Sequence, residues 1–262
     1  MPIKDSLGDR MKNYYENAYR MYLTRRTPVI IRIDGCHFHT FTRGMKKPYD
    51  MVLKKAMWNT AIYLCEHIQN ARLAYVQSDE ISILLVDYNK FTTSAWFDNN
   101  IQKMASVSAS MATMAFNKSF VEESEDASQY PSWYLSEKEF RMYREKWDSA
   151  TFDSRVFNIP ESEVCNYFIW RQQDATRNSI ETLGRCYFSQ KELNGVNCNG
   201  IQDKLMTEKE VNWNDAPVFF KRGACVKRIE SEDSSGWVLD MNIPIFSRNR
   251  KYIERNLEVE EE

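Results

Sequence analysis

Three acidic side chains stand where two short segments typical of β-strands end. Asp34 follows the first segment directly, and Asp79 with the adjacent Glu80 follows the second. If these two strands lie parallel in one sheet with a third strand between them, their carboxyl ends emerge at one edge. Carboxylates that converge there, beside the accessible carbonyl of Gly35, form a hard-oxygen site suited to Mg²⁺. Such a site can hold two ions that clamp the attacking and leaving oxygens of a phosphoryl transfer.

A simpler interpretation exists for each acid, because an acid that follows a strand often only caps a turn. For Asp34 or Asp79 taken alone, the turn cap is the better interpretation. For the pair at matched strand ends, with Glu80 adjacent, the pattern favours metal binding.

The segment after Asp34 could bind a triphosphate. Residues 35–39 would present successive backbone N–H groups beside the metal, and Lys47 would add a positive charge at the outer phosphate oxygens. The segment lacks the GxxxxGK[ST] pattern of a Walker loop, so by itself it is a weak signal. His39 could bond a phosphate or a base, or it could be a packed loop histidine.

A polar stripe runs along the segment that begins at Trp170. Arg171, Asp174, Arg177 and Asn178 are spaced by three and four residues and so share one side of a helix. The stripe could face phosphates or a neighbouring subunit, or it could be a solvated face, and the spacing alone does not decide between these.

The order of elements that would position these residues is β-α-β-β-α-β. Strands are predicted over residues 28–33, 72–77, 81–87 and 154–159, and amphipathic helices over about 50–69 and 98–117. Asp50 is the predicted N-cap of the first helix. This order predicts an α+β fold of the split ferredoxin-like type, an antiparallel sheet with helices on one face.

The remaining segments elaborate this core. Residues 119–150 are predicted to form an exposed insert with its own short helix, opened by a capping box at Ser136. A long helix over about 162–187, a further short helix and a strand over 217–229 would follow. We therefore expect a catalytic core over residues 1–160 and a C-terminal helix and strand elaboration over residues 161–262, packed on it.

The composition excludes several classes of protein. The 262 residues carry 35 Lys and Arg against 37 Asp and Glu, for a net charge of −2. Nucleic-acid affinity would therefore have to come from local basic clusters such as Lys221–Arg222. No apolar stretch approaches the ~18 residues of a membrane span. The six cysteines form no CxxC pair, which disfavours a zinc site or a disulfide framework. We expect a cytoplasmic protein.

Taken together, the motifs resemble those of the tRNA-His guanylyltransferase family and its bacterial, archaeal and phage relatives, the 3′–5′ tRNA-repair polymerases. The matching segments are Arg32–Gly35 with Phe38–His39, Lys47–Pro48, Gln77–Glu80, Phe152–Val156, Trp170–Gln172 with Asp174, and Arg222–Gly223. Their order and spacing cover about residues 28–225. The resemblance implies a polymerase-like palm, which agrees with the predicted element order.

The resemblance also implies a reaction and a set of residues. ATP would adenylylate the 5′-monophosphate of a tRNA, and the 3′-hydroxyl of GTP or another nucleoside triphosphate would then displace AMP. Two Mg²⁺ ions would be held by Asp34, the Gly35 carbonyl and Asp79, with Glu80 as an adjacent catalytic acid. The implied nucleotide-binding residues are Gly35, Cys36, His37, Phe38, His39, Lys47, Asp50 and Ser78. Asp50 would read the base, although it is equally a helix cap.

Contacts with a second nucleotide or the tRNA end are expected from the polar stripe and the basic pair. The resemblance adds weight to Asn178 and Arg222, and the full expected set is Arg171, Arg177, Asn178, Lys221 and Arg222. As in the family, a homotetramer built as a dimer of dimers is expected.

One departure from the family bears on the substrate. Eukaryotic members carry His-Ile-Asn-Asn where this chain has Thr176–Ser179, a pattern that looks like the repair-type relatives. It predicts templated repair of 5′-truncated tRNA. The alternatives are strict addition of guanosine to tRNA-His, or another palm enzyme such as a nucleotide cyclase or a 5′–3′ nucleotidyltransferase. A palm that binds RNA without catalysis is disfavoured, because it has no need of two converging acids.

Overall fold

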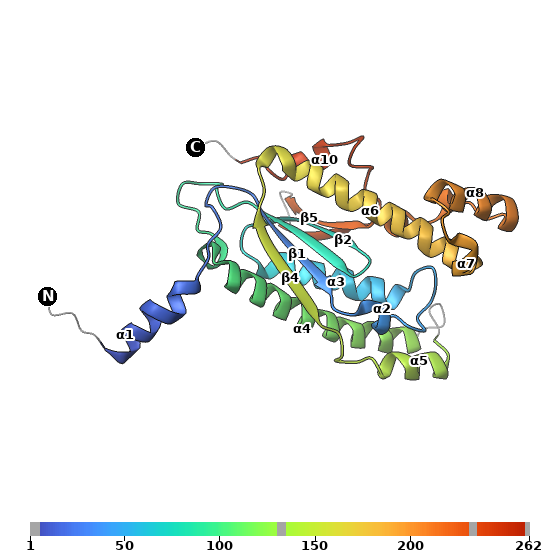
Figure 1. The fold of residues 1–262 in the computed structure, drawn as a ribbon, viewed down its shortest axis with the longest axis horizontal. Helices are drawn as coiled ribbons and strands as arrows, with labels where there is room; N and C mark the ends of the chain where they lie inside the picture. The colour runs from blue at the N-terminus through green and yellow to red at the C-terminus, as the bar shows by residue number, and fades with distance from the viewer. Residues whose placement is uncertain (1–5, 130–134, 231–234, 260–262) are drawn as a thin grey trace.

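The centre of the protein is a six-stranded antiparallel sheet in the order β4-β1-β3-β2-β5-β6. The structure is a computed structural model and describes residues 6–129, 135–230 and 235–259. In chain order the strands are β1 (Val29–Gly35), β2 (Ala71–Gln77), β3 (Glu80–Leu85), β4 (Phe152–Asn158), β5 (Ala224–Glu230) and β6 (Ser235–Asp240). The first four confirm the predicted split unit, because β1 and β2 both pair antiparallel with β3 and so run parallel to each other (Figure 1).

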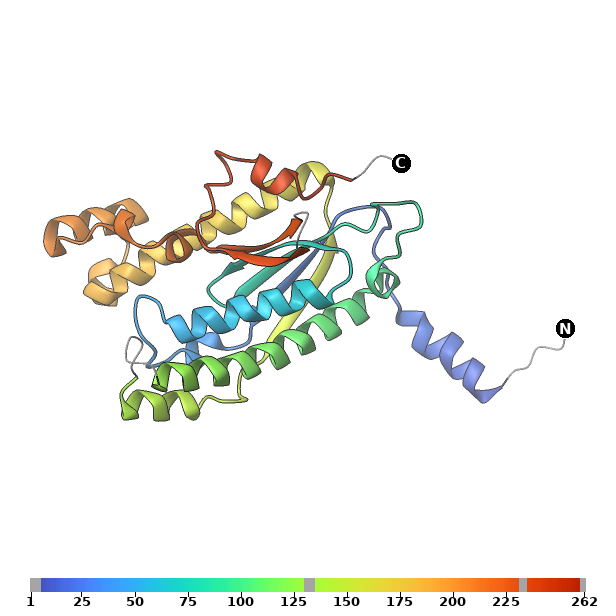
Figure 2. The ribbon, with the colours of Figure 1, turned by 180° about the vertical axis from the view of Figure 1, so that it is seen from behind.

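Helices cover both faces of this sheet. Along β1, Ile31 packs into one core and Ile30 into the other, and both side chains are fully buried. The first core lies under α3 (Met51–His67) and α4 (Ile101–Gln129), and the second under α6 (Glu161–Tyr187) (Figures 1 and 2). The prediction of helices on one face is confirmed for α3 and α4, the two helices of the split unit, and α6 of the C-terminal elaboration covers the other face. A strand that is apolar at successive positions, as β1 is, has to be covered on both sides.

The insert begins later than predicted. Helix α4 runs well past the expected end at residue 117 because buried side chains continue along it, so the first part of the predicted insert 119–150 belongs to this helix. The short helix of the insert is α5 (Glu137–Arg144), and the capping box at Ser136 is confirmed. Residues 130–134 of the insert lie outside the described residues.

The predicted strand over residues 217–229 is wrong in its first half. Residues 218–222 form the short helix α9 (Val218–Arg222), and β5 begins only after Gly223. Gly223 has a φ of +84°, and a Cβ at this position would overlap the backbone carbonyl of Val76 on the adjacent strand. Gly223 therefore permits the abrupt change from helix to strand.

The rest of the C-terminal part packs around α6. Helices α7 (Gln190–Leu193) and α8 (Cys198–Lys209) fold back on its end around a small separate core. Strands β5 and β6 extend the central sheet, and α10 (Lys251–Glu254) lies against α6 on the second face. These segments are the elaboration expected on the palm, whereas the division into two domains at residue 160 stays a prediction.

An N-terminal arm, residues 7–19, stands away from the body of the protein (Figures 1 and 2). It begins with α1 (Leu7–Met11) and continues as helical turns to Tyr19. Its apolar side chains are exposed, with Tyr14 at 72% and Tyr19 at 81%. Within the described ranges, no helix is both long enough and apolar enough to cross a membrane.

Candidate active site

Asp34 and Asp79 lie together at the carboxyl ends of β1 and β2. Asp79 sits in the tight turn between β2 and β3, and its carbonyl accepts a hydrogen bond of 3.1 Å from the N–H of Gly35. That bond ties the end of β1 to the hairpin, so the convergence expected from the topology is confirmed. Burial, followed by the charges of Asp79 and Glu80, raises the pKa of Asp34. Burial also raises the pKa of Asp79, against a hydrogen bond from Ser78 and the charge of Lys54.

This donor set fits a divalent cation. Two carboxylates with raised pKa values lie close enough to repel each other, so a bound cation would relieve their repulsion. In the part of the chain that the structure describes, no three His, Cys, Asp or Glu side chains are grouped to hold a metal. Mg²⁺ matches such a sparse set, because it is usually bound through one or two carboxylates and completes its shell with water and substrate phosphates.

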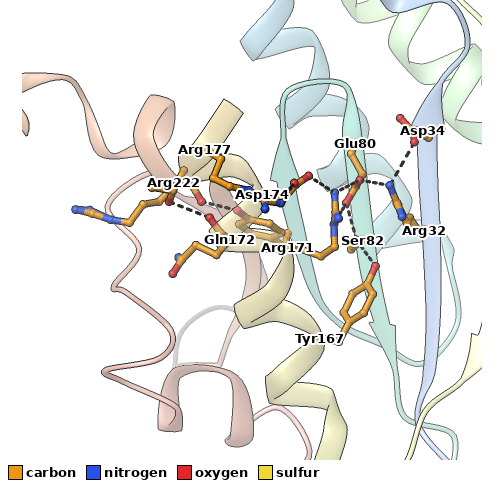
Figure 3. A network of polar contacts seen from close by, with 12 residues as sticks. Arg32, Asp34, Glu80, Ser82, Tyr167, Arg171, Gln172, Asp174, Arg177 and Arg222 are labelled. Carbon is orange, nitrogen blue, oxygen red and sulfur yellow. Dashed lines mark hydrogen bonds and ion pairs between the residues drawn. The ribbon is translucent and has the colours of Figure 1, made fainter. Parts of the chain in front are cut away.

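Glu80 has a different environment from the two aspartates. Its carboxylate receives both nitrogens of a fork from Arg171, at 2.8 and 2.6 Å, and an ion pair of 2.7 Å from Arg32 (Figure 3). Arg32 also lies 3.5 Å from Asp34, so the same arginine touches both acids. In this structure Glu80 is held as an anion between two guanidinium groups. Its position links the acid pair to α6, and its expected role as a catalytic acid stays a prediction.

The ion pairs continue along α6. Asp174 accepts from Arg171 at 3.0 Å and from Arg177 at 2.6 Å (Figure 3). Burial alone would raise the pKa of Asp174, but these two arginines hold it below its ordinary value. The Arg171 side chain is only 5% exposed, whereas that of Arg177 is 61% exposed. The guanidinium of Arg171 is therefore engaged inside the protein, and its expected contact with a second nucleotide or the tRNA end stays a prediction.

A pocket beside the acids brings together three of the eight residues expected to bind a nucleotide, whereas residues 35–39 are not among those that line it. Lys47 and Asp50 line it from the loop before α3, Ser78 lines it from the turn between β2 and β3, and Asn178 of α6 lines it as well. Gln77 also lines it, and among the described residues its buried Oε1 atom has no hydrogen-bond partner. A buried acceptor left without a partner is costly unless a ligand or water satisfies it. The pocket therefore has both the charge and the free polar atom of a ligand site.

Lys54 is the pocket residue that sequence reasoning missed. It lies on α3, one turn after Asp50, and lines the pocket close enough to Asp79 to interact with its charge. Burial lowers the pKa of Lys54 to about 8, while Asp79 favours its charged form. In the sequence Lys54 looks like one of several lysines on a solvated helix face. One feature of the sequence could have identified Lys54: it lies one turn after the Asp50 cap, and side chains on a helix lean toward the start of the helix.

Asp50 is a helix cap, as one of its two interpretations predicted. One carboxylate oxygen accepts the N–H of Leu53 at 3.0 Å, and the other accepts the N–H of Lys46 at 3.1 Å and the hydroxyl of Tyr143. With three donors already bound, Asp50 has little capacity left for a base. Its expected reading of a nucleotide base stays a prediction.

The segment 35–39 would offer a ligand its backbone groups more than its side chains. A Cβ at Gly35 would overlap the ring of Phe38, and Phe38 itself is buried against other aromatic rings of the first core. Cys36 donates its N–H to the carbonyl of Thr151 at 2.8 Å. His37, with a φ of +56°, and His39 are both exposed at the short helical turn that follows. The buried Phe38 thus anchors a turn whose outer edge faces solvent.

Two further expected RNA contacts have different surroundings. Lys221 is 7% exposed, donates to the carbonyl of Asn214 and lies over the ring of Trp213. Its expected contact with a second nucleotide or the tRNA end, like that of Arg171, stays a prediction. Arg222 is half-buried and lines a separate cleft beside α6 together with Arg177.

Comparison with known families agrees with this geometry. The model of the family described as tRNAHis guanylyltransferase matches residues 8–160, more than half of the chain. The chain belongs to the tRNA-His guanylyltransferase family. It is accordingly a nucleotidyltransferase, and the matched range contains the two strand ends that carry Asp34 and Asp79.

Relatives of known structure extend the match over nearly the whole chain. A bacterial tRNA-His guanylyltransferase-like protein in complex with ATP is 49% identical, with a TM-score of 0.83, covering 97% of this chain and 100% of that one. A second such protein, in complex with GTP, is 46% identical with a TM-score of 0.78 and the same coverage. These likenesses support the polymerase-palm assignment.

Sequence relatives are more distant. An uncharacterised protein of Acanthamoeba polyphaga mimivirus is 25% identical over 95% of this chain and 87% of its own length. The tRNA(His) guanylyltransferase 1 of Arabidopsis thaliana is 26% identical over 79% of this chain, which spans 35% of that protein.

Proposed function

We propose that this nucleotidyltransferase adds nucleotides in the 3′–5′ direction to the 5′ end of tRNA. The observation that carries the proposal is the pair Asp34 and Asp79, held at one sheet edge beside a pocket lined by Lys47 and Lys54. The acids suit the reacting phosphorus and the lysines suit a triphosphate. The bacterial relatives bound to ATP and to GTP support these two nucleotides as substrates.

The reaction requires two displacements at phosphorus. In the first, an oxygen of the tRNA 5′-monophosphate attacks the α-phosphorus of ATP and pyrophosphate leaves. In the second, the 3′-hydroxyl of the incoming nucleotide attacks the 5′-phosphorus, AMP leaves and the hydroxyl proton passes to solvent. Mg²⁺, held by Asp34, the Gly35 carbonyl and Asp79, would supply charge stabilisation in both.

The chain's own side chains orient the reactants. Lys47 and Lys54 would neutralise the outer phosphate oxygens, and Ser78 would donate to one of them. Arg32 and Arg171 hold Glu80 in place through ion pairs. These ion pairs keep the Glu80 carboxylate from repelling the phosphates. The proposed positioning needs no movement of the sheet, because β1, β2 and β3 are tied by their ladder.

We further propose that the substrate is a tRNA that lacks 5′ nucleotides and that addition follows the opposite strand. Arg177 stands where the eukaryotic pattern has Ile, and its largely exposed guanidinium is fixed by Asp174. A guanidinium recognises phosphate geometry and not one particular base. This favours recognition of tRNA ends in general over one identity element.

The test is a panel of 5′-monophosphorylated tRNAs of several identities, each lacking its first nucleotide. Each is incubated with ATP, Mg²⁺ and all four nucleoside triphosphates, and the 5′ ends are then sequenced. We expect addition of the nucleotide that pairs with the opposing base, and a change of product when that base is changed. The Asp79→Asn variant serves as the control without addition.

Two results would contradict the proposal. Addition of guanosine to full-length tRNA-His alone, whatever base lies opposite, would restore the strict guanylyltransferase. Cyclised nucleotide with no lengthening of any tRNA would instead favour the cyclase alternative.

A further inference from the structure

A second cleft lies at the end of the sheet opposite to the active site. Its walls come from the end of α3, the start of β2, the loop after β3, strands β5 and β6 and the C-terminal segment. Five of its lining residues are cations, namely Arg72, Lys90, Lys227, Arg228 and Arg255. Among the described residues that line the cleft, Glu66 is the single acid. In a chain whose net charge is −2, this is a marked separation of charge.

The surroundings of these cations leave the cleft basic. Lys227 is neutralised by an ion pair of 2.7 Å with Asp240. Arg72 donates to the neutral Asn89, and Arg255 lies 4.8 Å over the ring of Tyr252, so neither of these interactions removes a charge. Lys90 is exposed at the rim, where its backbone N–H donates to the hydroxyl of Thr93 and its charged end extends from an irregular loop.

We propose that this cleft binds the sugar–phosphate backbone of the tRNA at a distance from the 5′ end under reaction. This inference rests on the proposed function, which makes tRNA the substrate. The cleft offers guanidinium and ammonium groups from separate segments, which suits phosphates along a strand better than a compact ligand. Because the whole chain carries almost no net charge, RNA affinity has to come from such a local surface.

The position of the cleft fits a substrate that extends beyond the active site. Arg72 lies near the start of β2 and Gln77, which lines the triphosphate pocket, lies at its end. Gln77 lies five positions after Arg72 along the strand, a distance of roughly 17 Å at about 3.3 Å per residue. A tRNA whose 5′ end occupies the active site could reach the cleft only with a part of its body away from that end.

The experiment therefore compares two RNA substrates. One is a full-length 5′-truncated tRNA, and the other is a short hairpin that keeps only the first three base pairs of the acceptor stem with the same truncated end, too short to span the distance to the cleft. The variants are Lys90→Glu and the double variant Lys90→Glu with Arg255→Glu. Lys118→Glu is the matched control, because Lys118 is equally charged and exposed but lies on α4 outside the cleft. Thermal unfolding verifies that all variants are folded.

For the double variant we expect the KM for full-length tRNA to rise at least about tenfold with kcat unchanged, and the hairpin kinetics to stay at wild-type values. The slope of log affinity against log salt for full-length tRNA should fall by about 1 for each phosphate that the variant no longer binds. The control should match the wild type on both substrates.

Three outcomes would overturn the inference: an unchanged KM and salt slope for full-length tRNA, an equal loss on both RNAs, or a change confined to the KM for the nucleoside triphosphate. Direct binding of labelled tRNA, measured by fluorescence anisotropy, separates this inference from the proposed function. If the wild type added no nucleotide to either RNA, the proposed function would fail, and the anisotropy series would still decide whether the cleft binds RNA.

Discussion

At the scale of single residues, three acids that lie close together have different electrostatic environments. Asp34 and Asp79 are partly buried with raised pKa values, because burial and mutual repulsion disfavour their charged forms. Glu80 is buried more deeply, yet two arginines compensate its charge. The first two are thus suited to a cation that arrives from solution, whereas the ion pairs of Glu80 hold its carboxylate in place.

The first prediction concerns the two aspartates. Asp34→Asn or Asp79→Asn should lower nucleotide addition by more than about 100-fold. Loss of a residue that only hydrogen-bonds to a metal ligand costs up to about 100-fold, and loss of the ligand itself should cost more. Single-turnover assays across a Mg²⁺ titration measure this. The metal-free Asp34→Asn protein should unfold at the same or a higher temperature than the wild type, since the substitution removes a repelled charge. Activity near the wild-type level at limiting Mg²⁺ would refute the assignment.

The second prediction separates the nucleotide from the RNA. Lys54→Gln should raise the KM for the nucleoside triphosphate roughly tenfold or more, because a charge-assisted hydrogen bond to phosphate contributes about 1.5–3 kcal/mol. Lys47→Gln should act in the same direction. The affinity for tRNA, measured without nucleotide, should be unchanged in both. Loss of tRNA binding with normal nucleotide kinetics would move these lysines to the RNA surface.

At the scale of elements, α6 docks on the sheet through charge as well as through its apolar side. Arg171 reaches across to Glu80 on β3, and Asp174 then holds Arg171 from its own helix. Tyr167, one turn earlier, shares a hydrogen bond of 2.8 Å with Ser82 of the same strand (Figure 3). These contacts fix the height and rotation of α6 over β3, and therefore the position of Asn178 beside the pocket.

The third prediction tests this docking. Arg171→Met should lower the free energy of unfolding by about 3 kcal/mol, because it leaves Glu80 buried with Arg32 alone. Adding Glu80→Gln should recover part of the loss, since the uncompensated charge is then gone. Arg177→Met on the same helix is the control and should cost less than about 1 kcal/mol, as exposed ion pairs do. Equal losses for Arg171→Met and Arg177→Met in denaturant unfolding would contradict the docking role.

The fourth prediction concerns pH. The pKa of Asp174 is held below its ordinary value, so its ionised form stabilises the fold above the unfolded-state pKa of about 3.9. Asp174→Asn should therefore lower the melting temperature by a few degrees at pH 7, an effect of about 1 kcal/mol. The gap should stay constant down to about pH 5 and narrow below it, as the wild-type carboxylate takes up a proton. A gap that widened as the pH fell would have the wrong sign.

At the scale of the whole molecule, the N-terminal arm stands out because it packs little against the rest of the protein. Its α-helix and the helical turns that follow it are together no longer than isolated helices that are marginal in water, and its tyrosines are exposed. The family resemblance predicts a homotetramer. We expect the arm to contribute to the contacts between subunits, because its apolar side chains gain most from burial there.

The fifth prediction follows from that expectation. The double variant Tyr14→Glu with Tyr19→Glu should sediment as a smaller assembly than the wild type, which we expect to be a tetramer. Phe91→Glu is the matched control, because Phe91 is an equally exposed aromatic residue outside the arm. Its assembly should be unchanged. Analytical ultracentrifugation at several concentrations gives the result, and a double variant that stays tetrameric would exclude the arm from the interface.

The sequence by itself determined the parts of this protein that depend on local pattern and chain topology. Periodicity and turn residues located β1, β2, β3 and α3, and the Asp50 cap followed from its place before an amphipathic run. The meeting of Asp34 and Asp79 followed from the handedness and order of a split β-α-β-β-α-β unit, which leaves few ways to arrange the strands.

Only the tertiary structure decided which side chains face one another across the chain. Glu80 and Arg171 are 91 residues apart, and the sequence around neither residue reveals that the two side chains form an ion pair. Lys54 and Lys90 look alike in the sequence, yet one lies in the pocket beside Asp79 and the other at the rim of the distant basic cleft. The physical reason is that periodicity fixes the direction of a side chain relative to its own helix or strand. Its burial, its pKa and its partners depend on the elements that pack against it from elsewhere in the chain.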